Sequence, residues 1–142
     1  MKAQDIKVGH IYYVDFEPTR KGEFDKNHMA LVLKKTVNEI TFIVIPLTSN
    51  QSGLGINKVE LEITSQLPKN LQSKKTYAVY DQIRTVNASR FHPLLENGTL
   101  CEVKVSSEEL DIIVTAIIQN LLQGMPTEQV TSILKACSSI EK

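Results

Sequence analysis

The sequence lacks the features that mark several common classes of protein. Its 142 residues include only two cysteines, Cys101 and Cys137, with no CxxC motif and no cluster of cysteine and histidine. A disulfide framework and a structural zinc site are therefore not expected. No apolar run approaches membrane-spanning length, and the N-terminal residues contain no apolar signal segment. We expect a cytoplasmic protein that needs no metal or cofactor.

An excess of charge of one sign is also lacking. The 16 basic and 16 acidic side chains balance, so no global field indicates a nucleic-acid-binding protein. Residues 1–105 carry 14 basic and 11 acidic side chains, a net charge of +3, whereas residues 106–142 carry 2 and 5, a net charge of −3. A mildly basic body with an acidic tail is compatible with an anionic ligand but does not identify one.

Short β-strands account for most of the pattern before residue 106, and the length suits one domain. Runs of aromatic and β-branched residues between polar turns predict strands at residues 10–16, 29–36, 40–47 and 58–63, a strand that begins at residue 76, and a brief strand at residues 101–105. Asn38 and Glu39 predict a tight hairpin turn. The third of these strands is apolar at nearly every position, which predicts burial on both faces, whereas the fourth alternates as an edge strand does.

The stretch that the rest of the chain is expected to surround is residues 76–90. It begins as a strand and then gathers an acid, an amide, a guanidinium and a hydroxyl, which are Asp81, Gln82, Arg84 and Thr85. Such a strand end either fastens the fold or lines a site. Asp81 and Arg84 would form either an ion pair that locks the strand end or contacts with a substrate, and the sequence leaves both open.

Helical periodicity begins at residue 106. Ser106 and Glu109 have the spacing of a capping box, and apolar residues then recur at helical spacing. Gly124 ends this helix and Pro126 begins a shorter one. Strands followed by helices predict a mostly β (α+β) fold, a small antiparallel barrel closed by a C-terminal helix. We expect residues 1–124 to form this domain and residues 125–142 to form an additional helix packed on it.

Four blocks of the sequence resemble the MazF/PemK/Kid toxin family. They follow the family's order at similar spacing and are Gly9-His10-Ile11-Tyr12-Tyr13-Val14-Asp15-Phe16-Glu17-Pro18-Thr19, Ala30-Leu31-Val32-Leu33, Ile45-Pro46-Leu47-Thr48-Ser49, and Asp81-Gln82-Ile83-Arg84-Thr85-Val86 with Ser89-Arg90 just after. Any one block is weak, but the four in order are fairly specific. The resemblance covers residues 8–123, and the last helix looks like an addition.

The resemblance implies a fold, an activity and partners. Members of this family have an SH3-like barrel of the CcdB/PemK kind, usually form homodimers, and cleave single-stranded RNA at short sequences without a metal. The ribose 2′-hydroxyl attacks the adjacent phosphate and leaves a cyclic phosphate and a free 5′-hydroxyl. The reaction requires a base, an acid, and a donor for the charge that grows on the phosphorane. A cognate antitoxin inhibits these proteins by laying an extended tail over the RNA groove.

The resemblance assigns roles only where the motifs match. Thr48 matches a threonine at the scissile phosphate, where its hydroxyl donates to a non-bridging oxygen, and Asp81 matches an acid that some members place at the site. His28 departs from the family, which generally has a catalytic arginine there. Histidine exchanges a proton near neutral pH but lacks the permanent charge and bidentate fork of arginine. His28 is therefore either a working substitute or the mark of a lost activity.

The remaining candidates lie around these positions. Where some members carry a further arginine this chain has Val79, so Lys26 or Arg84 would supply the cation. The site is expected where the loops at residues 17–28 and 48–55 meet, and the other candidates for substrate binding or support are Ser49, Asn50, Gln82 and Thr85. Lysines would give salt-dependent affinity and an aromatic ring would stack on an unpaired base. The candidate RNA contacts, each of which is otherwise an ordinary loop residue, are Phe24, Lys69, Lys74 and Lys75.

Two other classes of function stay open. A non-catalytic protein on the same barrel, like the related CcdB toxins, would poison a topoisomerase by contact, although residues 121–125 do not obviously match the helix those toxins use. A repurposed member would bind RNA or a protein without cutting it, and the change at His28 supports this alternative. Growth arrest on expression would separate the toxins from the repurposed protein, and the target would separate the two kinds of toxin.

Overall fold

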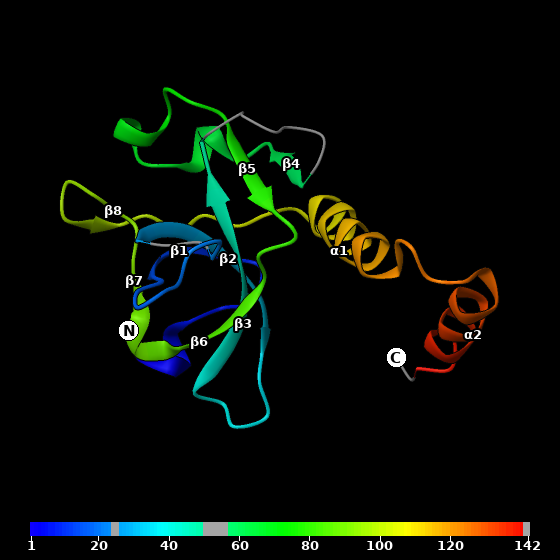
Figure 1. Cartoon of the computed structure of the whole chain (residues 1–142). Coiled ribbons are helices and arrows are strands. Elements are labelled where there is room, and N and C mark those ends of the chain that lie inside the picture. Colours follow the sequence, from blue (N-terminus) through cyan, green and yellow to red (C-terminus); the bar gives the residue numbers. More distant parts are fainter. Residues whose placement is uncertain (24–25, 50–56, 141–142) are drawn as a thin grey trace.

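The structure is a computed structural model that describes residues 1–23, 26–49 and 57–140 (Figure 1). One antiparallel sheet contains β1 (Ile11–Asp15), β2 (Asn27–Lys35), β3 (Thr41–Thr48), β4 (Lys58–Leu61), β5 (Thr76–Val79), β6 (Arg84–Asn87) and β7 (Phe91–His92). A separate hairpin of β8 (Leu95–Glu96) and β9 (Thr99–Leu100) precedes the helices α1 (Ser107–Leu122) and α2 (Thr127–Cys137). Four single-turn 3-10 helices lie in the described connections, at Ala3–Asp5, Thr64–Gln66, Lys69–Leu71 and Ala88–Arg90.

β3 is the central strand of this sheet. On one side it pairs with β2, and on the other it pairs first with β6 and then with β5. Positions 44–47 are all buried, which confirms the burial on both faces that their apolar sequence predicts. β4 lies at the end of the strand order, as its alternating pattern predicts.

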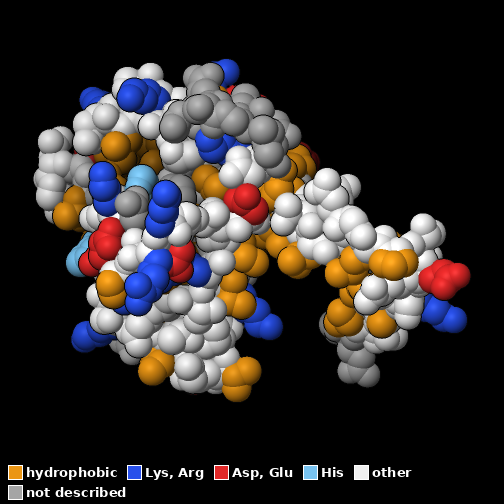
Figure 2. Space-filling view, in the orientation of Figure 1, with side chains coloured by type: hydrophobic (Ala, Val, Ile, Leu, Met, Phe, Trp, Pro, Cys, Tyr) orange, Lys and Arg blue, Asp and Glu red, His pale blue; other side chains and the backbone are white. Residues whose placement is uncertain are grey.

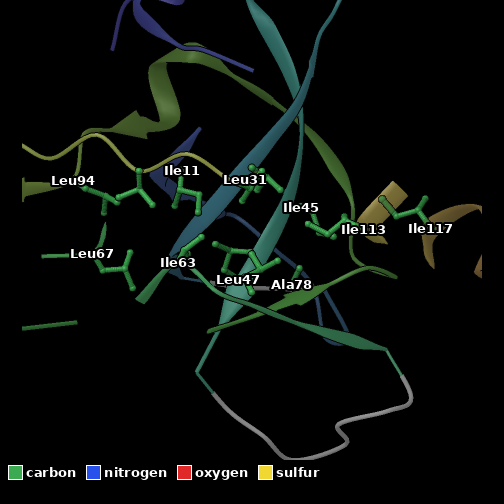
Figure 3. Packing of buried hydrophobic residues seen from close by; sticks show 13 residues of the cluster. Ile11, Leu31, Ile45, Leu47, Ile63, Leu67, Ala78, Leu94, Ile113 and Ile117 are labelled. Carbon is green, nitrogen blue, oxygen red and sulfur yellow. The ribbon is translucent and has the colours of Figure 1, made fainter. Parts of the chain in front are cut away.

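Two hydrophobic clusters form the core. Successive side chains of a strand point to opposite faces, so neighbouring residues of β2 and β3 enter different clusters. One cluster also receives α1, and Figure 3 shows its members Ile11, Leu31, Ile45, Leu47, Ala78, Ile113 and Ile117. The other contains Val14, Phe16, Val32, Phe42, Val44 and Phe91. The packing therefore fixes the register of β2 against β3, because a shift by one residue would exchange the two faces.

The fold class is confirmed, with one correction to the barrel. The two ends of the strand order are β4 and β7, and the described strands include no pairing between them, so hydrogen bonding does not close the sheet into a barrel. β7 has only two residues and is followed at once by Pro93, which has no amide hydrogen for a further ladder bond. The sheet stops there, and the chain continues into the β8–β9 hairpin.

The brief strand predicted at residues 101–105 is wrong. Within it only Lys104 forms a bridge, to His10. Ile11 N donates to Val103 O and Val105 N donates to Gly9 O, both at 3.0 Å. These bonds attach the segment beside β1 without a continuous ladder. The alternation that predicted a strand reflects the burial of Val103 and Val105.

Both C-terminal helices begin where the sequence predicts. The capping box of α1 is present, with Glu109 N donating to Ser106 Oγ at 3.1 Å. In return, Ser106 N donates to one carboxylate oxygen of Glu109 at 3.4 Å. The other carboxylate oxygen accepts from Glu62 N at 2.7 Å, which ties the helix to the segment after β4. α2 follows Pro126, buries no residue, and stands away from the sheet beyond α1 (Figure 1). Its packing on the domain therefore stays a prediction. Neither helix is long and apolar enough to cross a membrane, and the same holds for the rest of the described chain.

Candidate active site

His28 and Thr48 occupy facing strand ends. In the pairing of β2 with β3, Ala30 lies opposite Pro46, and the same register continued by two residues sets His28 opposite Thr48. The β2–β3 ladder ends at Ala30 and Pro46, short of these two residues. His28 is paired with Val14 of β1, and Thr48 with Tyr77 of β5. The sheet therefore opens between these two half-buried residues.

A cavity of about 350 Å³ lies at this opening. Its apolar lining comes from Tyr13, Met29, Leu47 and Leu71, which also belong to or pack against the first hydrophobic cluster. Its polar lining consists of Asn27, His28, Thr48, Ser49, Asn70, Ser73, Lys74, Lys75 and Thr76. The cavity thus brings together both predicted catalytic residues, one predicted supporting residue and two predicted RNA contacts.

Thr48 also lines a second cavity, of about 260 Å³. The other described residues that line it are Gly22, Glu23, Asn57, Lys58, Val79 and Gln82. Gln82 is therefore brought to the neighbourhood of Thr48, as predicted. Because Thr48 borders both cavities, an extended ligand that occupied both would pass over Thr48.

Asp81, Arg84 and Thr85 line neither cavity. The Asp81 carboxylate accepts a hydrogen bond from Asn57 Nδ2 at 3.2 Å. Arg84 and Asp81, both described residues, do not form the ion pair that was one of the two alternatives from the sequence. Arg84 Nη1 instead donates to the Phe16 carbonyl at 3.2 Å. Thr85 is exposed on β6. The four polar residues of positions 81–85 that the sequence predicts at one site therefore do not lie together. Only Gln82 among them lines a cavity.

The two arginines of this region fasten the end of β1. Arg84 contacts the Phe16 carbonyl, and its guanidinium lies over the Phe16 ring, 5.5 Å from the ring centroid. Arg90 donates to the carbonyls of Asp15, at 3.1 Å, and of Glu17. Three successive carbonyls are thus held by arginine. This arrangement supports the connection from β1 to β2, which leads to His28.

Lys26 and Lys69, which are two other predicted residues, line neither cavity. Lys26 is exposed, and its backbone amide donates a hydrogen bond to Glu17 Oε1 at 3.0 Å. Lys69 N donates to Glu96 Oε1 at 3.2 Å. Phe24 and Asn50 lie outside the described residues. Lys75, at the rim, forms an ion pair with Glu60 at 3.5 Å, in which both side chains are largely exposed.

Sequence reasoning missed the uncharged polar residues of the rim. Asn27 precedes His28, while Asn70 and Ser73 lie in the 64–75 loop, whose lysines are the only RNA contacts that the sequence predicts there. The signal was present, because the otherwise polar loop contains two leucines: Leu67 is buried in the core cluster and Leu71 packs against it. An anchored loop residue brings its polar neighbours to the surface beside it.

The described residues offer little for metal or thiol chemistry. No group of three His, Cys, Asp or Glu side chains among them could hold a metal ion. Burial raises the pKa of the Cys101 thiol, which donates to the Gln66 carbonyl and so stays a weak nucleophile. The groups in the larger cavity are instead an imidazole, hydroxyls, amides and ammonium groups. Such a set transfers protons and binds anionic oxygens.

The fold and this cavity define a small antiparallel β domain with a polar, lysine-lined opening beside its central strand. Residues 7–121 match the family described as PemK-like, MazF-like toxin of type II toxin–antitoxin system. The chain therefore belongs to this toxin family.

Solved structures of MazF proteins have the same fold. MazF from Deinococcus radiodurans is similar with a TM-score of 0.58 and 20% identity, over 82% of this chain and 96% of that chain. Two MazE–MazF structures from the same organism give TM-scores of 0.52 and 0.51 at 20% and 19% identity, covering 82% and 85% of this chain and 95% and 97% of those chains. No curated protein is similar enough to count as a match.

Proposed function

We propose that the protein is a metal-independent endoribonuclease, the toxin of a toxin–antitoxin pair, which cleaves single-stranded RNA. The observation that carries the proposal is the cavity in which His28, Thr48, Lys74 and Lys75 lie together. Family membership supports the same activity. The substrate would be a messenger RNA in the cytoplasm, cut at a short sequence.

The reaction is an internal transesterification. The ribose 2′-oxygen forms a bond to the adjacent phosphorus, and the bond from phosphorus to the 5′-oxygen breaks. The 2′-hydroxyl loses its proton, and the leaving 5′-oxygen gains one. His28 would carry this proton transfer, which typically contributes 10²–10⁴-fold, roughly, to such a rate. The Thr48 hydroxyl would donate to a non-bridging oxygen while negative charge grows on it.

The rest of the rim would bind the strand. Lys74 and Lys75 supply positive charge for phosphates on either side of the scissile bond, an interaction that weakens as salt rises. Tyr13, in the apolar lining, offers a ring on which an unpaired base stacks. Gln82 and Ser49 would contact the neighbouring nucleotides. In this proposal Arg84 and Asp81 support the site from outside.

Partners follow from the same reasoning. Two of the similar structures are MazE–MazF complexes. We infer that a cognate antitoxin binds this chain as well and inhibits it. A homodimer is proposed too, because members of the family usually dimerise.

The first experiment incubates the purified protein with mixed-sequence single-stranded RNA in EDTA. Wild-type protein should leave cyclic-phosphate ends, and His28→Ala and Thr48→Ala should each lower the rate by about 10²-fold or more. His92→Ala and Thr99→Ala are matched controls, because both residues are exposed and line neither cavity. They should cleave at the wild-type rate.

A second candidate function would replace the first if the RNA stays intact. His28 stands where an arginine is usual in the family, and a member without that arginine would bind RNA without cutting it. Retention of RNA by well-folded wild-type protein, without any cleavage, would support this binding function. Cleavage that His28→Arg increases would instead show that histidine is a weaker substitute in a working nuclease.

A further inference from the structure

The 64–75 loop forms one wall of the cavity of about 350 Å³, and it is held more firmly than its polar sequence suggests. Leu67 is buried in the first hydrophobic cluster, and Leu71 packs against that cluster. Gln66 Nε2 donates to the Lys104 carbonyl, and Gln66 Oε1 accepts from the Lys104 amide, both at 3.0 Å. The loop is therefore fastened to the domain by two leucines and by one amide side chain.

Asn70 lies between two anchored neighbours. On one side, Lys69 N donates to Glu96 Oε1 of the β8–β9 hairpin at 3.2 Å. On the other side, Leu71 packs against the core, and its amide closes the 3-10 turn by donating to the Pro68 carbonyl at 2.9 Å. The backbone of Asn70 is therefore fixed at a position from which the residue lines the cavity.

The carboxamide of Asn70 is available to a ligand. The loop contains three side-chain amides, and two of them hold the loop itself. Gln66 is bonded to Lys104, and Gln72 Nε2 donates to the Leu67 carbonyl at 2.7 Å. The Asn70 carboxamide has no hydrogen-bond partner among the described residues, and of the three amides it is the one that lines the cavity.

A free carboxamide suits the edge of a nucleic-acid base. It presents an acceptor and a donor side by side, and single-stranded RNA is recognised by hydrogen bonds to the edges of its unpaired bases. Adenine offers a donor beside an acceptor on two edges, at N6 with N1 and at N6 with N7, and N6 with N7 is the usual pairing for asparagine.

The rest of the lining suits the other parts of a nucleotide. Figure 2 shows basic and hydrophobic side chains side by side on the sheet domain, and the cavity combines the same two kinds. Lys74 and Lys75 offer charge to phosphates, and the Tyr13 ring offers a face on which a base stacks. Asn70 adds a group for the edge of that base.

We propose that Asn70 is a specificity-determining residue that binds the edge of an unpaired adenine, and that Glu96 is the positioning residue that holds Asn70 in place. A side chain on a fixed backbone loses less freedom on binding, so its hydrogen bonds contribute more to affinity. This inference rests on the proposed function for the identity of the ligand as single-stranded RNA. It does not require that the RNA is cut.

The test uses a short single-stranded RNA library of random sequence in which fluorine replaces every 2′-hydroxyl, so that the proposed reaction cannot occur. Sequencing of the bound fraction should show adenine enriched by about tenfold at one position for wild-type protein. Asn70→Ala should lose this enrichment. Asn70→Asp should move it to guanine, because a carboxylate only accepts and guanine has two donors, N1–H and N2–H₂, on one edge.

Asn120→Ala and Asn120→Asp are the matched controls, since Asn120 is an exposed asparagine of α1 that lines neither cavity of the candidate site. Both should keep the wild-type enrichment. Wild-type protein that binds the library without enriching adenine, or that does not bind it, would overturn the proposal. So would Asn70 variants that keep the wild-type pattern.

Two variants test the role of Glu96. Glu96→Ala removes the acceptor of Lys69 N and should lower the enrichment of adenine by about threefold or more. Glu96→Gln keeps an oxygen at the same place and should restore it. No loss in Glu96→Ala, or an equal loss in both variants, would overturn the positioning role.

Cleavage of ordinary RNA separates this inference from the proposed function. If the enriched base follows residue 70 but RNA with its 2′-hydroxyls stays intact, the base contact stands and the proposed nuclease does not. If wild-type protein cuts RNA and the Asn70 variants bind the library with the wild-type pattern, the nuclease stands and the base contact is wrong.

Discussion

His10 is a residue whose surroundings predict a dependence of stability on pH in the acid range. Burial, and then the positive charge of Lys7, lower the pKa of its imidazole from the usual 6.5. The unfolded chain therefore takes up this proton at a higher pH than the folded chain does. Since stability falls wherever the unfolded state binds more protons, the free energy of unfolding decreases as pH falls through 6.5 toward the folded pKa.

Replacing His10 should remove that decrease. Denaturant unfolding of wild type and His10→Gln, compared between about pH 7.5 and 5.5, should show that wild type loses more stability toward acid than the variant. Lys7→Gln should reduce the acid loss partly, because burial and the charge of Lys104 still lower the pKa of His10. A stability difference between wild type and His10→Gln that is constant with pH would contradict the argument.

At this scale the sequence predicts the residues at the centre of the candidate site and its lysines, but not the amide and hydroxyl side chains of its rim. His28 and Thr48 were found because they lie in or beside blocks that keep the family's order. Asn70 and Ser73 belong to no block, and their place depends on how the 64–75 loop folds back. Leu71 anchors that loop in the core, and Lys69 N is bonded to Glu96 of the β8–β9 hairpin. No local pattern encodes a contact between segments so far apart.

At the scale of the elements, β6 is held to the end of β1 by the side chain of Arg84, which allows a prediction about stability. Arg84→Ala should lower the free energy of unfolding by about 2 kcal/mol, since it removes a charged hydrogen bond to the Phe16 carbonyl and the stacking on the Phe16 ring. Arg20→Ala should change it by less than about 0.5 kcal/mol, because Arg20 is exposed. Urea unfolding measures both.

The cleavage rate distinguishes the two roles of Arg84 that the sequence leaves open. If Arg84 acts through the fold, Arg84→Ala should retain cleavage under conditions where the variant is fully folded. A variant of wild-type stability that no longer cleaves would show that the guanidinium contacts the substrate instead.

Residues 76–90 also show why the periodicity of apolar residues does not predict where one strand ends and the next begins. Alternating Tyr77, Val79 and Ile83 suggest one strand, but the structure divides it into β5 and β6. The reason lies in β3, where Leu47 is paired with Ala78 while Val44 is paired with Arg84. A turn that begins at Val79, whose carbonyl accepts from Gln82 N at 3.1 Å, separates the two pairings. Alternation continues across that turn and conceals it.

For the whole molecule, the sequence predicts strands before helices, the burial of β3 and both helix starts, because each follows from a local pattern. Closure of the sheet is different, since it depends on whether two distant edge strands meet. The distribution of charge is predicted from the sequence only in part. The basic body was visible in the sequence, but only the fold shows that Lys74 and Lys75 share a cavity with His28.

The last helix allows a prediction about the molecule as a unit. The buried hydrophobic residues end at Ile117, so a chain that stops at residue 124 keeps the whole described core. At dilutions where the full chain is monomeric, the shortened chain should unfold with a free energy within about 0.5 kcal/mol of it. At higher concentrations the full chain should gain more stability by mass action than the shortened chain.

Thermal unfolding at several protein concentrations tests this prediction directly. Parallel unfolding of the two chains at dilution, with divergence at high concentration, would show that α2 packs on a second copy of the chain. A stability loss of several kcal/mol in the shortened chain at every concentration would show that α2 packs on its own domain in solution, as the sequence alone predicts. The concentration dependence decides between them, because contacts within one chain do not respond to dilution.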